Sequence, residues 1–225
     1  MYLAIEGIKG SGKSTLFDRL VSDPAIAINQ FSILRPTVAD ETNLVDRMFK
    51  RFCQRCPDIV VERMFARRSN RASRQVPKRT NLILGERSLI TSYVTRWDAD
   101  DPEAGMGRVD KMHSHIRLPD YVLYLAIDPR VAAARIAARP ARTYGVHDET
   151  LARLYEADRI YRYLAVHGAI HGMAYVRWAI VDASAHIEQV FAHVRTLVTD
   201  QLAVMPNQLC EPARFSKVNS TKDQS

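Results

Sequence analysis

The chain has 225 residues, of which 47% are hydrophobic and 25% charged, and it carries a formal net charge of +7. This composition excludes a disordered or fibrous chain, and three cysteines are too few for a disulfide scaffold. Because no apolar run approaches the ~20 residues that cross a bilayer and no signal peptide is visible, we expect a one-domain cytoplasmic protein with no membrane partner.

The first part of the chain alternates apolar strands with helical segments. Residues 1–6 predict a buried strand, and residues 14–21 predict the helix that follows it. A second strand is expected over residues 31–35, where the apolar run ends before a proline. Two helices are then expected at about residues 41–54 and 59–75.

The pattern continues through the middle of the chain. Residues 81–85 predict a third buried strand, and the near-continuous apolar run 121–127 predicts a fourth, which is typical of a parallel strand. Between them, residues 98–107 are acidic and contain glycine and proline, which predicts a surface loop. A helix is expected to begin at Pro129 and to run to about Arg139.

The last third of the chain completes the alternation. Apolar residues at helical spacing follow Glu149, residues 175–181 predict a fifth strand, and residues 187–198 predict an amphipathic helix. From residue 205 the chain is polar, and we expect the tail 205–225 to be disordered. This alternation predicts an α/β fold in which helices cover both faces of a parallel sheet.

The stretch 7–14, Gly-Ile-Lys-Gly-Ser-Gly-Lys-Ser, lies between the first strand and its helix and fits the phosphate-loop pattern. Its glycines let successive backbone N–H groups point into one cavity, and the helix adds the positive end of its dipole. Lys13 would reach the β- and γ-phosphates of ATP, and Ser14 would bind Mg²⁺. The residues of the loop expected to hold ATP are Gly7, Lys9, Gly10, Ser11, Gly12, Lys13, Ser14 and Thr15.

Further polar residues fall at the carboxyl ends of the predicted strands, where parallel sheets bind their ligands. Glu86 would hold Mg²⁺ through water, and Arg87 would clamp an acceptor phosphate bidentately. A surface salt bridge is the alternative for this pair. Arg35 and Asp128 follow two other strands and would meet them at the same edge.

Two groups of arginines are further candidates. Arg135 and Arg139 share a helix face, and Arg142 follows, so this segment could close over ATP, supply cations and expel water. The alternative is a solvated helix end. The basic run 63–79 could line the acceptor site through Arg67 or Arg71, bind nucleic acid, or form a solvated face.

With these residues assembled, the chain resembles the thymidylate kinase family of nucleoside monophosphate kinases. The resemblance rests on residues 5–15, on 86–88 with 91–92, on 119–129 with Arg135 and Arg139, and on 181–184. It implies a P-loop kinase fold over residues 1–204, with a five-stranded parallel sheet, a lid near 139–149 and often a homodimer. ATP and Mg²⁺ are the implied cofactors, and the catalytic residues would be Lys13, Arg87, Arg139 and Arg142.

The chain departs from the family pattern on the acceptor side. Lys9 stands where the family usually has an aspartate. After the second strand the family has Arg-Glu-Pro, whereas this chain has Leu34-Arg35-Pro36 and no glutamate. Glu86-Arg87-Ser88 is the form seen in deoxynucleoside kinases. The residues expected to bind the acceptor are Arg35, Arg67, Arg71, Glu86 and Arg87.

Three functions therefore compete. The first is transfer of the γ-phosphoryl group of ATP to a (deoxy)nucleoside monophosphate, with a thymidylate-like substrate. It is favoured because a hydroxyl acceptor needs a general base, and no glutamate follows the second strand. The second is a deoxynucleoside kinase that phosphorylates a 5′-hydroxyl. The third is a nucleotide-dependent nucleic-acid-binding protein without turnover, which salt-dependent binding would reveal.

Overall fold

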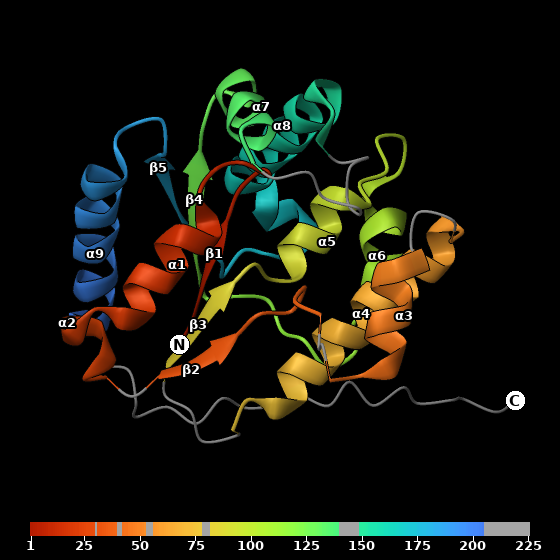
Figure 1. Ribbon diagram of the computed structural model, residues 1–225, viewed down its shortest axis with the longest axis horizontal. Helices are drawn as coiled ribbons and strands as arrows, with labels where there is room; N and C mark the ends of the chain where they lie inside the picture. Colours follow the sequence, from red (N-terminus) through yellow and green to blue (C-terminus); the bar gives the residue numbers. More distant parts are fainter. Residues whose placement is uncertain (30, 40–41, 53–55, 78–81, 140–148, 205–225) are drawn as a thin grey trace, which may run out of the picture.

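The computed structural model describes residues 1–29, 31–39, 42–52, 56–77, 82–139 and 149–204. Its centre is one sheet of five parallel strands in the order β2-β3-β1-β4-β5, which confirms the predicted α/β class (Figure 1). The strands are β1 (Tyr2–Glu6), β2 (Phe31–Leu34), β3 (Leu82–Glu86), β4 (Tyr121–Ala126) and β5 (Arg177–Asp182).

The central strand β1 is buried along its whole length. Ala4 is paired with Gly85 of β3 on one side and with Val122 of β4 on the other. Both neighbouring strands are also wholly buried, which explains why their sequences are almost continuously apolar. The loop that follows β1 is therefore anchored in the middle of the core.

Helices cover both faces of the sheet. On β4, Tyr124 stacks on Tyr161 of α8, whereas the next residue, Leu125, lines a cavity together with Leu16 of α1 and Val190 of α9. Successive side chains of a strand point to opposite faces, so α8 and the α1–α9 pair lie on different sides. The helices on the latter side are α1 (Lys13–Ser22), α2 (Pro24–Ala27) and α9 (Ile187–Val204), which contact one another.

The remaining helices form a second group. Within it, α5 contacts α6 and α8, and α7 contacts α8. The helices α3 and α4 lie together beside α6 (Figure 1), and Asn70 of α4 donates a hydrogen bond to the carbonyl of Met112. The group comprises α3 (Leu44–Phe52), α4 (Asp58–Gln75), α5 (Leu89–Thr95), α6 (Pro102–Met112), α7 (Pro129–Ala137), α8 (Leu151–His167) and the 3₁₀ helix η3 (Gly168–His171).

The prediction of a surface loop over residues 98–107 is wrong, because α6 begins at Pro102. The carboxylate of Asp101 caps the helix by accepting a hydrogen bond from the N–H of Ala104, at 2.9 Å. Proline at the first helical position and an acidic N-cap are helix-start signals that also occur in turns. Gly105 is a packing residue, since a Cβ atom there would lie 3.0 Å from the Cβ of Asp98.

Several expected features fall partly or wholly outside the described residues. These are the tail 205–225 and most of the lid near 139–149, including Arg142. Among the described residues, no helix combines the length and the apolarity that crossing a membrane requires.

Candidate active site

The phosphate loop, residues 7–14, joins β1 to α1 and needs its glycines. Gly7, Gly10 and Gly12 have φ angles of 147°, 86° and 91°, which L side chains rarely adopt. A Cβ atom on Gly10 would lie 2.5 Å from the carbonyl oxygen of Ala132 in α7. The glycine therefore also lets α7, which carries Arg135, approach the loop.

Lys13 lies inside this loop, only 5% exposed. Its ammonium donates hydrogen bonds to the carbonyl oxygens of Gly7 and Ile8, at 2.7 and 2.6 Å. Burial lowers the pKa of Lys13 well below its ordinary value, and the nearby Arg87 guanidinium lowers it further. This arrangement concentrates positive charge at the mouth of the loop, where the phosphates of a nucleotide would bind.

Ser14 and Glu86 meet across the site. The Ser14 hydroxyl donates a hydrogen bond to Oε1 of Glu86, so the first turn of α1 contacts the end of β3. Hydroxyl and carboxylate oxygens are the ligands that Mg²⁺ prefers, together with water and phosphate oxygens. The two residues expected to hold the metal are therefore brought together, and their oxygens fit it.

Arg35 approaches the other side of Glu86. Its Nε atom lies 3.2 Å from Glu86 Oε2, and its guanidinium also pairs with Asp18. The guanidinium lies over the ring of Phe17, 4.6 Å from the centroid. Arg35 follows β2 as predicted, but its charge is already matched by two carboxylates.

Arg87 has an unusual backbone conformation. Its φ angle of 73° is in the left-handed region, which non-glycine residues rarely occupy and which costs roughly 1–3 kcal/mol. Such strain persists where the surroundings enforce it, often at functional sites. Among the described residues, Arg87 has no carboxylate partner, unlike Arg35.

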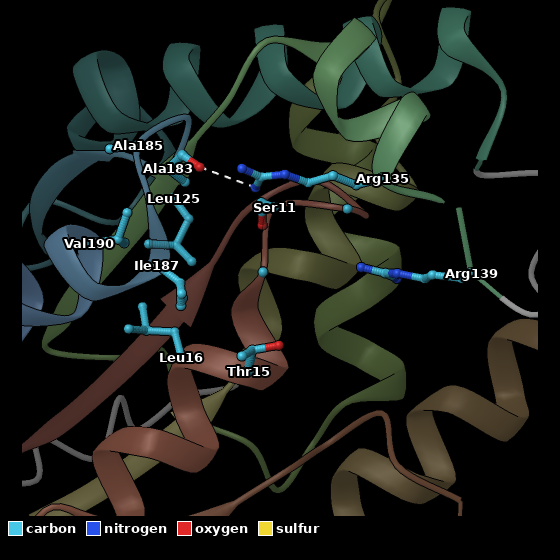
Figure 2. Close-up of a pocket in the computed structure, with 12 residues that line it drawn as sticks. Ser11, Thr15, Leu16, Leu125, Arg135, Arg139, Ala183, Ala185, Ile187 and Val190 are labelled. Carbon is cyan, nitrogen blue, oxygen red and sulfur yellow. Dashed lines mark hydrogen bonds between the residues drawn. The ribbon is translucent and has the colours of Figure 1, made fainter. Parts of the chain in front are cut away.

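A cavity of about 240 Å³ opens beside the loop, lined by residues of the loop, α1, β4, α7, the segment after β5 and α9 (Figure 2). Arg135 points across it and donates a hydrogen bond of 3.1 Å to the carbonyl of Ala183. Arg139 lines the same cavity, and no carboxylate in the described chain pairs with it. The other lining residues are Gly10, Ser11, Gly12, Thr15, Leu16, Leu125, Ala185, Ile187 and Val190.

Of the remaining predicted site residues, one lies at the loop and the others have structural or surface positions. Lys9 lies 3.9 Å from Glu149 at the loop. Asp128 caps α7 by accepting a hydrogen bond from the N–H of Arg130, which accounts for its place at the end of β4. Arg67 is exposed, and Arg71 pairs with Asp46 of α3 at 2.9 Å.

Two polar clusters were missed from the sequence. Asp46 is 2% exposed and also binds buried Arg68, at 3.0 Å, so one acid from another helix pairs with two arginines of the basic run 63–79. Glu6, at the end of β1, is fully buried and bonds to Ser88. A glutamate that ends an otherwise apolar buried strand is a signal that could have indicated the second cluster.

No protein-family model and no curated protein matches the chain. Among solved structures, deoxyadenosine kinase from M. mycoides with bound dATP is similar, with a TM-score of 0.61 and 15% sequence identity. The similarity covers 88% of this chain and 100% of that chain. The protein therefore has the fold of P-loop nucleoside kinases. The resemblance to thymidylate kinases holds at this broader level of the fold.

Proposed function

We propose that the protein is an ATP-dependent kinase that phosphorylates the 5′-hydroxyl of a deoxynucleoside. The observation that carries this proposal is the meeting of three groups: the phosphate loop with buried Lys13, the Ser14–Glu86 pair, and Arg87, which has no carboxylate partner among the described residues. Phosphoryl transfer depends mainly on positioning and on neutralising charge, and these groups supply both.

The donor side takes the nucleoside triphosphate. The backbone N–H groups of the loop and the N-terminus of α1 would cradle the phosphates, with Lys13 on the β- and γ-phosphates. The base would enter the cavity between Arg135 and the segment after β5. Mg²⁺ held by Ser14 and Glu86 would neutralise phosphate charge. Arg139, with Arg142 from the expected lid, would stabilise the transferred group.

The acceptor side favours a neutral group over a phosphate. Of the cations expected to bind an acceptor phosphate, Arg35 is paired with Asp18 and Glu86, and Arg71 with Asp46. The charge of Arg35 is therefore matched within the protein, and that of Arg71 is partly offset by a carboxylate that it shares with Arg68. The similarity to a deoxyadenosine kinase and the Glu86-Arg87-Ser88 sequence support the same acceptor.

Glu86 is our candidate for the general base. Its Oε1 faces Ser14 and the phosphate loop, whereas its Oε2 faces Arg35 at the end of β2. The acceptor oxygen would form a bond to the γ-phosphorus as the bond to the β-phosphate oxygen breaks. The hydroxyl proton would pass to Oε2, and ADP would leave.

A second candidate is the nucleoside monophosphate kinase reaction, with a thymidylate-like acceptor. One observation favours it: the residue after β2 is Arg35, so a glutamate base is missing there. A monophosphate needs no base, and it could displace Asp18 from the Arg35 guanidinium, because that carboxylate is 65% exposed.

The deciding experiment measures ADP release and kcat/KM on matched pairs, each a deoxynucleoside and its monophosphate, with Lys13→Ala as the inactive control. We expect the deoxynucleoside to be the better substrate of each pair, both in the wild type and in Arg35→Ala. Monophosphates that outperform their nucleosides, with the advantage lost in Arg35→Ala, would select the second candidate. Salt-dependent DNA binding without ADP release would contradict both.

A further inference from the structure

Glu6 is a buried carboxylate that takes no part in the proposed transfer of the phosphoryl group. It ends β1 directly before the phosphate loop and is 0% exposed. Within the described chain no lysine, arginine or histidine forms an ion pair with it. A buried carboxylate is costly unless other groups bond to it, so its partners indicate what it does.

Four neutral donors surround this carboxylate. Oε1 accepts hydrogen bonds from the backbone N–H and the hydroxyl of Ser88, at 2.6 and 2.7 Å. Oε2 accepts them from the Thr91 hydroxyl, at 2.6 Å, and from the Tyr161 hydroxyl, at 2.9 Å. A carboxylate has about four acceptor positions, so Glu6 is saturated. It ties β1 to the turn after β3, to α5 and to α8.

Ser88 directly follows Arg87, whose backbone is in the left-handed conformation. The groups on both sides of Arg87 are held. Its N–H donates to the Ile5 carbonyl at 3.0 Å, and its own carbonyl accepts from the Tyr2 hydroxyl at 3.3 Å. With the Ser88 N–H bound by Glu6, the strained conformation is fixed from three directions.

Gly85 leaves room for the ring of Tyr2, whose hydroxyl contacts the Arg87 carbonyl. A Cβ atom on Gly85 would lie 2.6 Å from the ring of Tyr2, so any other residue would displace that ring. Without the ring in this position, the Tyr2 hydroxyl could not reach the Arg87 carbonyl. The neighbours of Arg87 are therefore arranged so that its backbone is held.

The neutral character of the donors has a consequence for Arg87. An arginine that paired with Glu6 would turn inward and would be lost to the ligand. Because Ser88, Thr91 and Tyr161 satisfy the carboxylate instead, the Arg87 guanidinium, which acts electrostatically on Lys13, stays free of an ion pair within the described chain.

We propose that Glu6 is a positioning residue for phosphoryl transfer, which holds Ser88 and thereby aims the Arg87 guanidinium at the phosphate loop. The inference rests on the proposed kinase function and adds to it a residue that acts through another. It predicts that the effect of changing Glu6 depends on the presence of Arg87.

The test is a double-mutant cycle of Glu6→Ala and Arg87→Ala, with kcat, KM for ATP and thermal midpoint measured for each variant. We expect Glu6→Ala to lower kcat by about a hundredfold, the order of effect of a misplaced catalytic group. In the Arg87→Ala background it should lower kcat less than about threefold. Glu6→Gln should restore most of the activity, because its amide oxygen can still accept from the Ser88 N–H.

Thr91→Val is the matched control, because it removes a donor on Oε2 and leaves the bonds to Ser88 in place. Its kcat should stay close to that of the wild type. Equal losses from Glu6→Ala in both backgrounds, or a loss that only follows a lower folded fraction, would overturn the proposal. If the wild-type protein phosphorylates no acceptor, the proposed function fails. In that case the Kd for ATP with Mg²⁺ is measured by calorimetry for the same single and double variants, and the coupling between them decides the role of Glu6.

Discussion

The Ser14 hydroxyl donates a hydrogen bond to Oε1 of Glu86, and this contact joins the start of α1 to the end of β3. Two oxygens from segments far apart in the sequence are thus placed together beside the phosphate loop. Neither would need to move far to share a metal ion, so the proposed metal site would be organised before an ion binds.

Ser14→Ala should therefore weaken Mg²⁺ binding more than it affects the fold. We expect the Mg²⁺ concentration for half-maximal activity to rise on the order of tenfold, the effect typical of changes near a metal. Activity titrated with Mg²⁺ at saturating ATP measures this. Ser22→Ala, at the exposed other end of α1, should leave the titration unchanged. An unchanged Mg²⁺ requirement in Ser14→Ala would remove Ser14 from the metal site.

Arg139 should act mainly in the transition state. It lines the cavity beside the loop and forms no ion pair within the described chain, so its charge is available for the transferred phosphoryl group. Arg139→Ala should lower kcat by about 10²-fold and change the KM for ATP much less. Arg130→Ala, an exposed arginine in the first turn of α7, is the control. A higher KM with normal kcat would instead assign Arg139 to ground-state binding.

Gly10→Ala should distort the junction between the phosphate loop and α7. The residue has a φ angle of 86°, and a Cβ atom would meet the Ala132 carbonyl at 2.5 Å. We expect a loss of about 1–3 kcal/mol in the free energy of unfolding and weaker ATP binding. Gly107→Ala is the matched control: it lies in α6 with open space around it, so stability should rise by about 0.5–1 kcal/mol. Chemical denaturation of the two variants measures both changes in the free energy of unfolding.

Asp46→Ala should strongly destabilise the α3–α4 pair. It would leave Arg68 buried without its carboxylate, 5.2 Å from the ring of Phe49 and 5.6 Å from that of Phe65. Removing one partner of a buried pair costs about 3–5 kcal/mol, whereas Glu156→Ala, in an exposed pair with Arg153, should cost below about 1 kcal/mol. The double variant Asp46→Ala with Arg68→Met should recover much of the loss. If it does not, the lost charge pair is not the cause.

His113 should make stability fall on the acid side of neutrality. Burial lowers the pKa of His113 below its ordinary value of 6.5, against the opposing effect of Asp110. The unfolded chain therefore binds the proton at higher pH than the folded protein. The full contribution is present above pH 6.5 and is lost as the pH falls from there through the lowered folded pKa.

His113→Asn should flatten the slope of unfolding free energy against pH in this window, although it lowers stability overall. The exposed neighbour His115 provides the control, because His115→Asn should leave the slope as it is. An unchanged slope in His113→Asn would show that other groups cause the acid sensitivity.

The sheet and the phosphate loop could be predicted because their signals are local. A buried apolar strand, a fixed glycine spacing and a following helix lie in one short stretch, and each further strand shows as an apolar run. Since carboxyl ends of parallel strands share an edge, the nearness of Glu86 to Ser14 followed from the same pattern.

Which arginines of the acceptor side are paired with carboxylates could not be predicted in this way. Arg71 and Arg68 looked like free cations because Asp46, on another helix, is 25 and 22 residues away from them. Arg35 is likewise matched by Asp18 from α1. Such pairs depend on how helices dock, which neither propensity nor spacing specifies. The helix α6 was missed because its capping residues are also common in loops.

The central place of β1 has a consequence for how the protein is made. The strand that carries the phosphate loop leaves the ribosome before the other strands of the sheet, yet its neighbours are β3 and β4, which end at Glu86 and Ala126. Contacts across such distances in sequence form slowly, because the long chain between them must first be closed. Stalled chains that lack β4 should therefore bind no ATP, and nucleotide can protect the growing chain from proteases only once β4 has been synthesised.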